Sequence, residues 1–142
     1  MEQSELTSRD WYEGFEPEPL EFEVTPELNE QYLYSQQDYD PMYLDNGDGP
    51  ALVHPSLLLN MSNTTRSPSH NLAPGVSSIH ARDEVFFKAP AVVGQRFTVR
   101  WFVESTFEKR GRDYRITRAT ITDADDKTIL VRKVHSTFAA SS

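Results

Sequence analysis

Apolar and polar residues alternate along the chain from residue 76 onward, with the period of two that is typical of half-buried β-strands. Between residues 97 and 103 the apolar residues that share one face are Phe97, Val99, Trp101 and Val103. The pattern predicts four strands, over residues 79–87, 97–103, 114–121 and 129–138. Short segments separate them, at residues 93–95, 109–112 and 123–126. Because these segments have the length of hairpin connections, we expect an antiparallel, meandering sheet.

The preceding part of the chain predicts one short strand and two helices. Residues 20–24 alternate apolar and acidic side chains, which favours a strand. Thr25 and Pro26 form a typical helix start, and the helix is expected to continue to about Gln37. Residues 55–63 are mostly apolar on all sides, as in a short helix that other structure surrounds. This order predicts an α+β domain in which one curled antiparallel sheet wraps around a central helix.

The chain of 142 residues has the size of one domain, which we place at residues 20–142. Residues 1–19 are rich in Glu and contain two prolines, so we expect an acidic arm without regular structure. The aromatic residues expected to hold this arm against the domain are Trp11, Tyr12 and Phe15. Residues 38–52 and 64–75 are rich in turn-forming residues and are predicted to be loops.

The composition argues against several classes of protein. Without cysteine the chain has no disulfide, thiol nucleophile or cysteine-based zinc site. His70, His80 and His135 lack the spacing of metal ligands, so no metal site is expected. No apolar run approaches the ~18 residues of a transmembrane helix, and the polar, acidic N-terminus is unlike a secretory signal. We therefore expect a cytoplasmic protein that does not bind membranes.

Charge is distributed unevenly along the chain, whose net charge is −8. Residues 1–48 contain fourteen acidic residues and one basic residue, whereas residues 49–142 contain eight acidic and thirteen basic residues. The two parts are therefore expected to face each other or different partners. The acidic total disfavours nucleic acid as a partner, but the basic part could bind an anionic ligand.

Three segments together resemble a known family. Residues 38–43 read DYDPMY, residues 53–56 read VHPS, and residues 86–104 read FFKAPAVVGQRFTVRWFVE. Over residues 20–140 the chain resembles the MaoC-like hydratase/dehydratase family, which has a hotdog fold, an Asp-x-Asn-Pro-x-His loop and a His-Gly step before the buried helix. The resemblance implies reversible hydration of a 2-enoyl thioester such as an acyl-CoA. It implies no cofactor other than the coenzyme A of the substrate.

Two positions depart from the motifs of that family. Tyr43 stands in place of the loop His, and Pro55 in place of the Gly. Both changes resemble the FAS1-type N-terminal hotdog half, which shapes the acyl pocket while a second hotdog carries the Asp/His pair. The chain is therefore either a hydratase or a non-catalytic acyl-binding subunit beside a catalytic MaoC-like chain, and a hotdog thioesterase is a third alternative. Because open sheet edges need pairing, we expect a homodimer or a heterodimer with another hotdog chain.

Three residues are candidates for catalysis under this resemblance. Asp38 matches the loop Asp and is the expected acid/base, although Asp38 and Asp40 could equally be turn formers. Tyr43, with an ordinary pKa of about 10, is a proton donor or an aromatic wall of the pocket. His54 directly precedes a helix N-terminus, which favours its neutral form. It is therefore either a base or a residue that caps the helix.

Three polar residues in the second helix are candidates for binding the substrate. Ser56, Asn60 and Asn63 have i, i+4 and i+7 spacing on an otherwise apolar helix. Because buried polar groups need partners, we expect this stripe to face a pocket, a water or a subunit contact.

Basic residues are candidates for the phosphates of coenzyme A, since arginine suits phosphate oxygens. Arg110 and Arg112 lie in the hairpin predicted at residues 109–112, and Arg66 follows the second helix. A basic hairpin can equally be a solvated turn, so both interpretations stay open.

Overall fold

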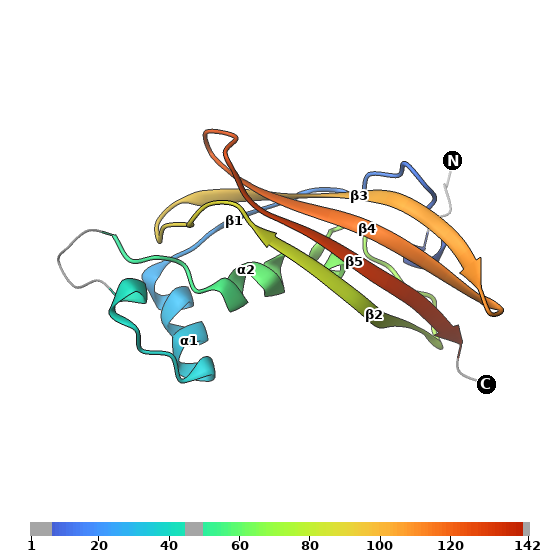
Figure 1. Ribbon diagram of the computed structural model, residues 1–142, viewed down its shortest axis with the longest axis horizontal. Coiled ribbons are helices and arrows are strands. Elements are labelled where there is room, and N and C mark those ends of the chain that lie inside the picture. The colour runs from blue at the N-terminus through green and yellow to red at the C-terminus, as the bar shows by residue number, and fades with distance from the viewer. Residues whose placement is uncertain (1–6, 45–49, 141–142) are drawn as a thin grey trace.

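The computed structural model describes residues 7–44 and 50–140 and contains a five-stranded antiparallel sheet with two α-helices (Figure 1). The strands are β1 (Leu20–Glu23), β2 (Val76–Phe87), β3 (Arg96–Lys109), β4 (Arg112–Asp123) and β5 (Thr128–Ala140). The helices are α1 (Pro26–Gln36) and α2 (Pro55–Met61). Short 3₁₀ helices occupy Ser8–Asp10, Pro41–Tyr43 and Thr64–Arg66. The start of the predicted arm and the middle of the predicted 38–52 loop lie outside the described residues.

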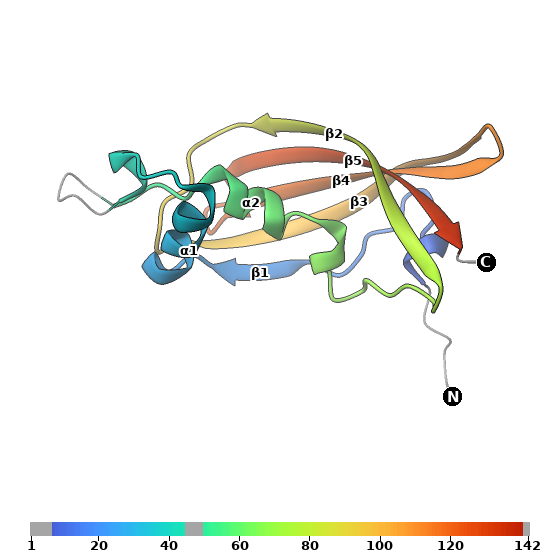
Figure 2. The same ribbon diagram turned by 90° about the horizontal axis from the view of Figure 1, so that it is seen from below.

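The sheet curls around α2, which lies against its concave face (Figure 2). Leu57 and Leu58 of α2 are buried in one core cluster with Phe97 and Trp101 of β3. The indole Nε1 of Trp101 also donates a hydrogen bond to the backbone oxygen of Ser62 at 3.0 Å, which ties the end of α2 to the sheet. The α+β architecture, the central helix and the buried face of β3 are therefore confirmed.

The strand order β1-β3-β4-β5-β2 differs from the predicted meander in one place. β3, β4 and β5 follow one another as hairpins, but β2 pairs with β5 and does not pair with β3. The prediction of a hairpin connection at residues 93–95 is therefore wrong. Residues 88–95 instead contact the segment before α2, where the N–H of Val53 donates to the carbonyl of Ala91 at 2.8 Å. The length of a connection does not say which strands pair, because contacts from elsewhere in the chain decide it.

The ends of both helices follow local signals. The Oγ1 of Thr25 accepts a hydrogen bond from the N–H of Leu28 at 3.1 Å and caps α1. The left-handed φ of +52° at Gln37 ends that helix, as predicted. α2 is shorter than predicted, because it ends at Met61 and leaves Asn63 outside the helix. No helix in residues 7–44 and 50–140 has the length and apolar character of a membrane span.

The N-terminal arm lies along β3, beyond the point where β1 begins. The N–H of Gly14 donates to the carbonyl of Val103 at 2.8 Å, and the N–H of Val103 donates to the carbonyl of Phe15 at 2.9 Å. Trp11 is only 3% exposed, whereas Tyr12 is 59% exposed. The arm is thus held by Trp11, as predicted, but Tyr12 does not bury its ring against the domain.

β2 forms an edge of the sheet and is exposed along most of its length. Within the described residues its outer side pairs with no other strand. Phe86 and Phe87, at its end, are large apolar side chains that remain about half exposed. An unpaired strand edge with exposed aromatic rings is a surface that proteins usually cover.

Candidate active site

Asp38 and His54 lie in contact although sixteen positions separate them in the sequence. The Nε2 of His54 is 3.0 Å from the Oδ2 of Asp38. Asp38 directly follows the C-cap of α1, and its N–H donates to the carbonyl of Leu33 at 3.0 Å. His54 is the N-cap of α2. The ends of two successive helices therefore bring these side chains together.

Asn29, which the sequence analysis missed, holds the backbone around this pair. Its Oδ1 accepts from the N–H of His54 at 2.9 Å, and its Nδ2 donates to the carbonyls of Tyr43 and Leu52. The side chain is almost fully buried, one helical turn before the buried Leu33. The spacing of Asn29 and Leu33, four residues apart on one helix face, was the available signal. A polar group on an apolar helix face must find hydrogen-bond partners, so this spacing indicates a buried, structural amide.

The hydrogen bonds of His54 determine which ring nitrogen carries the proton. The backbone N–H of Ser56 points at Nδ1 at 3.1 Å, and the Oγ of Ser56 is 2.7 Å from the same atom. A backbone N–H can only donate, so Nδ1 accepts and the proton of the neutral ring lies on Nε2. Nε2–H then donates to Asp38. His54 thus caps the helix, and neither ring nitrogen has a free lone pair.

Asp38 keeps capacity to accept further hydrogen bonds. Its Oδ1 accepts the N–H of Asp40 at 3.2 Å, and its side chain is 38% exposed. Asp40 in turn accepts the N–H of Met42 at 3.1 Å and caps the short helix that follows. Both carboxylates therefore form the turn, which was one of the two alternatives for Asp38. A carboxylate has about four acceptor positions, so Asp38 can also accept a hydrogen bond from a water.

Tyr43 lies beside this pair, with ring centroids 4.8 Å apart between Tyr43 and His54. Burial raises the pKa of its phenol, and the negative charges of Asp38 and Asp40 raise it further. The phenol therefore keeps its proton at neutral pH. Whether Tyr43 is a proton donor or an aromatic wall of the pocket stays a prediction.

An apolar cavity of about 390 Å³ opens next to Tyr43. It lies between the residues before and within α2, including Val53 and Leu58, and the end of β2 with the connection that follows, including Phe87 and Pro90. Tyr43 also lines a second cavity of about 240 Å³ on the side of Asn29. Neither Asp38 nor His54 lines these two cavities, and Tyr43, whose ring contacts His54, is the residue that connects the pair with them.

The polar stripe predicted on α2 finds its partners inside the chain. Ser56 contacts His54, as described above, and Asn60 accepts a hydrogen bond from Arg66. Asn63 lies beyond the helix, and its Oδ1 accepts from the Nη1 of Arg132 at 2.9 Å. Only Ser56 is therefore near the Asp38–His54 pair, and the other two lie toward the opposite end of α2.

Arg110 lies in the turn between β3 and β4, and Arg112 is the first residue of β4, at the far end of the sheet from α1 (Figure 1). Within one chain the structure does not bring them to the Asp38–His54 pair. Arg66 also stays apart from the pair, in the short helix after α2. Their role in binding phosphate stays a prediction.

Arg132 is a buried residue that the sequence analysis did not single out. Its Nε and Nη2 donate to the carboxylate of Asp83 at 2.6–2.9 Å, and its Nη1 donates to the carbonyl of Leu59 at 2.7 Å. It shares its strand face with Leu130 and Val134, which are buried. An arginine between two inward-facing apolar residues was the signal. The described residues contain no group of His, Asp and Glu that could hold a metal ion.

No protein-family model matches this sequence, and no curated protein matches it. Solved structures do match. The (R)-hydratase PhaJ1 from Pseudomonas aeruginosa superimposes with a TM-score of 0.76 at 13% identity, over 94% of this chain and 84% of that one. The HadBC complex from Mycobacterium tuberculosis, a 3R-hydroxyacyl-ACP dehydratase, gives a TM-score of 0.71 at 15% identity, over 92% of this chain and 99% of the other.

A third match is a thioesterase superfamily member from Thermus thermophilus, with a TM-score of 0.60 at 20% identity, over 90% of this chain and 83% of that one. At such identities the likeness shows the fold. The chain has the hotdog fold, which these hydratase, dehydratase and thioesterase structures share.

Proposed function

We propose that the protein catalyses the reversible hydration of a 2-enoyl thioester of coenzyme A or a related carrier, with Asp38 as the acid/base. The observation that carries this proposal is the 3.0 Å contact between Asp38 and His54. The proposal needs no cofactor beyond the carrier of the acyl group. It is also supported by the hydratase and dehydratase structures that share the fold.

In the hydration direction Asp38 accepts a proton from water while the water oxygen bonds to the β-carbon. The phenol of Tyr43 protonates the α-carbon. The protonated Asp38 then returns its proton to the Tyr43 phenolate, which restores both groups. General acid and base groups must lie within hydrogen-bond reach of the atoms they serve, and both side chains lie around His54.

His54 is a positioning residue in this proposal. Because Nδ1 accepts from Ser56, Nε2–H can only donate, and it holds the carboxylate of Asp38 in one orientation. This replaces the prediction that His54 itself could serve as the base. A fixed donor beside a base keeps the base oriented for proton transfer.

The apolar cavity of about 390 Å³ is the proposed place for the acyl chain. Leu58, Val53 and Phe87 give it apolar walls, and Lys88 lies among its lining residues. Most ligand pockets combine such walls with a few polar groups. Tyr43 would connect this cavity with the reacting carbons.

One observation favours a second candidate, the non-catalytic subunit that binds an acyl chain beside a catalytic hotdog chain. The thioester oxygen needs N–H donors while it gathers negative charge. At the start of α2, Pro55 has no N–H, Ser56 donates to the Nδ1 of His54, and Leu57 donates to the carbonyl of His54 at 3.0 Å. The first turn of α2 therefore offers no free donor within this chain.

Incubation of the purified protein with crotonyl-CoA tests these candidates together. Loss of the enoyl absorbance without release of free thiol supports the hydratase. Release of thiol supports a thioesterase, the third activity found on this fold. Binding without either change supports the non-catalytic subunit. The same assay with the variant Asp38→Asn tests the role of Asp38 as the acid/base. Asp125→Asn is its matched control, because Asp125 lies in the exposed turn between β4 and β5.

The proposal includes a second hotdog chain, identical or different, that pairs along β2. The outer side of β2 pairs with no strand among the described residues, and Phe86 and Phe87 are exposed there. Sedimentation at micromolar concentration tests this expectation. A single species of 16.3 kDa would contradict the identical pair, and it would leave a different partner chain as the version to test by co-expression.

A further inference from the structure

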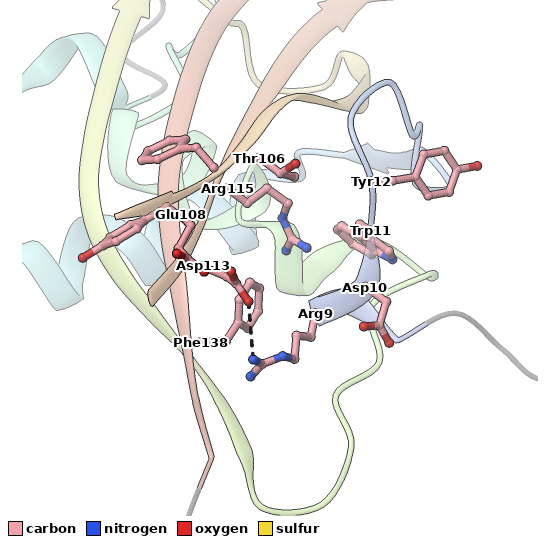
Figure 3. A pocket seen from close by; sticks show the side chains of 11 residues that line it. Arg9, Asp10, Trp11, Tyr12, Thr106, Glu108, Asp113, Arg115 and Phe138 are labelled. Atoms are coloured by element: carbon pink, nitrogen blue, oxygen red, sulfur yellow. Dashed lines mark ion pairs between the residues drawn. The ribbon is translucent and has the colours of Figure 1, made fainter. Parts of the chain in front are cut away.

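A third cavity, of about 390 Å³, lies between the N-terminal arm and the β3–β4 hairpin. This hairpin is at the other end of the sheet from α1 (Figure 1). Figure 3 shows Arg9, Asp10, Trp11 and Tyr12 of the arm on one side and Asp113, Arg115 and Phe138 of the sheet on the other. None of these residues belongs to the candidate active site.

Arg115 is the central feature of this cavity. Arg115 is only 4% exposed. Its guanidinium lies between two aromatic rings, 4.9 Å from the ring centroid of Trp11 and 4.8 Å from that of Phe138. Nη1 donates to the backbone oxygen of Ser8. The buried Nε has no hydrogen-bond partner, and among the described residues no carboxylate pairs with the group.

A buried cation without a carboxylate is unusual. Removing a charge from water is costly unless a partner of opposite charge or several hydrogen bonds replace the water. The two ring faces contribute cation–π attraction, but they cover only the flat sides of the guanidinium. Burial lowers the pKa of Arg115 to about 10, so the group is still a cation at neutral pH. Figure 3 shows the terminal nitrogens of Arg115 directed into the cavity, so an anion can meet this end of the guanidinium, while Nε stays enclosed.

The acidic residues around the cavity restrict which anion fits. Asp113 faces Arg9 at 3.8 Å, and Asp10 accepts the hydroxyl of Thr7 at 2.6 Å. These carboxylates, together with Glu108, would repel a multiply charged phosphate more strongly than a single carboxylate. The aromatic walls favour a ligand with a flat apolar body, and the parallel rings of Phe107 and Tyr114 add to them.

We propose that this cavity is a binding site for a small aromatic monocarboxylate, whose carboxylate meets the edge of the Arg115 guanidinium. The ring of the ligand lies against the aromatic side chains of the arm and the hairpin. The site therefore joins the arm to the sheet and is separate from the acyl-thioester chemistry proposed for Asp38.

Titration of the full chain with benzoate, followed by tryptophan fluorescence, tests the proposal. Trp11 lines the cavity, and Trp101, the other tryptophan, is buried in the core. We expect saturable binding of benzoate at millimolar concentrations. Benzamide has the same shape without the charge. We expect its affinity to be at least about tenfold lower than that of benzoate, as for the loss of one charged hydrogen bond.

The variant Arg115→Gln keeps a donor for Ser8 but removes the charge, and we expect benzoate to bind about tenfold more weakly to it. Arg110→Gln, in the exposed turn, is the matched control and should bind benzoate like the wild type. Equal affinity for benzoate and benzamide, tighter binding of inorganic phosphate, or no saturable signal with benzoate would each overturn the proposal. The comparison of the two ligands on the wild type decides the matter even where Arg115→Gln does not fold.

Discussion

The two ends of α2 carry the same kind of pair, a carboxylate beside a nitrogen-bearing side chain. At the N-terminal end the Nε2 of His54 lies 3.0 Å from Asp38, and near the C-terminal end the Nη2 of Arg132 lies 2.6 Å from Asp83. Arg132 places three donor contacts on Asp83 and also reaches the carbonyl of Leu59. Asp38 receives one hydrogen bond from a side chain and one from the backbone.

This difference distinguishes a structural ion pair from a pair that can take part in proton transfer. The C-terminal pair joins β2, β5 and α2 through a permanent cation, and each guanidinium nitrogen of Arg132 donates to a partner. The N-terminal pair uses a single imidazole N–H donor and leaves acceptor positions on a partly exposed carboxylate. The number of donors around a carboxylate therefore indicates which pair can exchange protons with a substrate.

The variant Asp38→Asn should have the largest effect, because an amide oxygen cannot take a proton from water. We expect kcat for crotonyl-CoA to fall by about a hundredfold to ten-thousandfold, the usual contribution of a general acid–base group. Near-ultraviolet circular dichroism should be unchanged. Steady-state kinetics beside the Asp125→Asn control measures this, and an unaffected kcat would show that the acid/base assignment is wrong.

The variant Arg132→Met should lower the free energy of unfolding by about 3 kcal/mol, because it leaves Asp83 with only the imidazole of His80, at 3.3 Å, and α2 without a donor at its end. Denaturant unfolding measures this, with Arg82→Met as the control, since Arg82 is exposed and makes only a 3.9 Å contact with Glu84. The double variant Arg132→Met with Asp83→Leu should recover part of the loss. Equal decreases in the free energy of unfolding for Arg132→Met and Arg82→Met would show that the Arg132–Asp83 pair is not a structural anchor.

The variant Tyr43→Phe should lower kcat by about a hundredfold if the phenol is the proton donor. Because the pKa of Tyr43 is raised above its ordinary value of 10, the donor stays protonated at neutral pH and is lost only above pH 10. The wild type should therefore show no fall in kcat caused by Tyr43 below that pH. A pH–rate profile of both proteins measures this, and a small loss in Tyr43→Phe would leave the residue as a wall of the cavity.

Substitution of Ser56 should have the smallest effect and sharpens the role of His54. Ser56→Ala removes the hydroxyl but keeps the backbone N–H that faces Nδ1, so kcat should fall by less than about tenfold. Ser56→Pro removes that N–H and should cost more. Nitrogen NMR of labelled histidine should find the Nε2–H form of His54 in the wild type and in Ser56→Ala. The Nδ1–H form in either protein would contradict the proposed positioning role.

Much of the architecture could be predicted from the sequence because its causes are local. The alternation from Phe97 to Val103 marks a strand whose odd positions are buried, and Thr25 with Pro26 marks a helix start. The resemblance to a hydratase/dehydratase family correctly indicated the hotdog fold. The residues Asp38 and His54 could be named as candidates, but not placed in contact, since no periodicity relates two helix ends across a loop.

The pairing of strands and the burial of single polar side chains required the tertiary structure. β2 could have paired with β3 or β5, and contacts of the intervening segment with residues before α2 decided for β5. Asn29 and Arg132 were missed because a polar residue on an apolar face is identified as an anchor only when its partners are known. Asn63 was placed in the helix by its spacing, yet it lies beyond the end of α2 and contacts Arg132.

The sequence by itself determined the elements, their order, their buried faces and the residue types available for chemistry, because propensity, capping and alternation act over a few neighbouring residues. Only the tertiary structure decided that Asp38 meets His54, that Nδ1 of His54 is an acceptor, and that Arg115 is buried without a carboxylate. These properties depend on atoms that are far apart in the chain and come within 3–5 Å only after folding. Hydrogen bonds and charge interactions act over such short distances, so they could be assigned only from the folded structure.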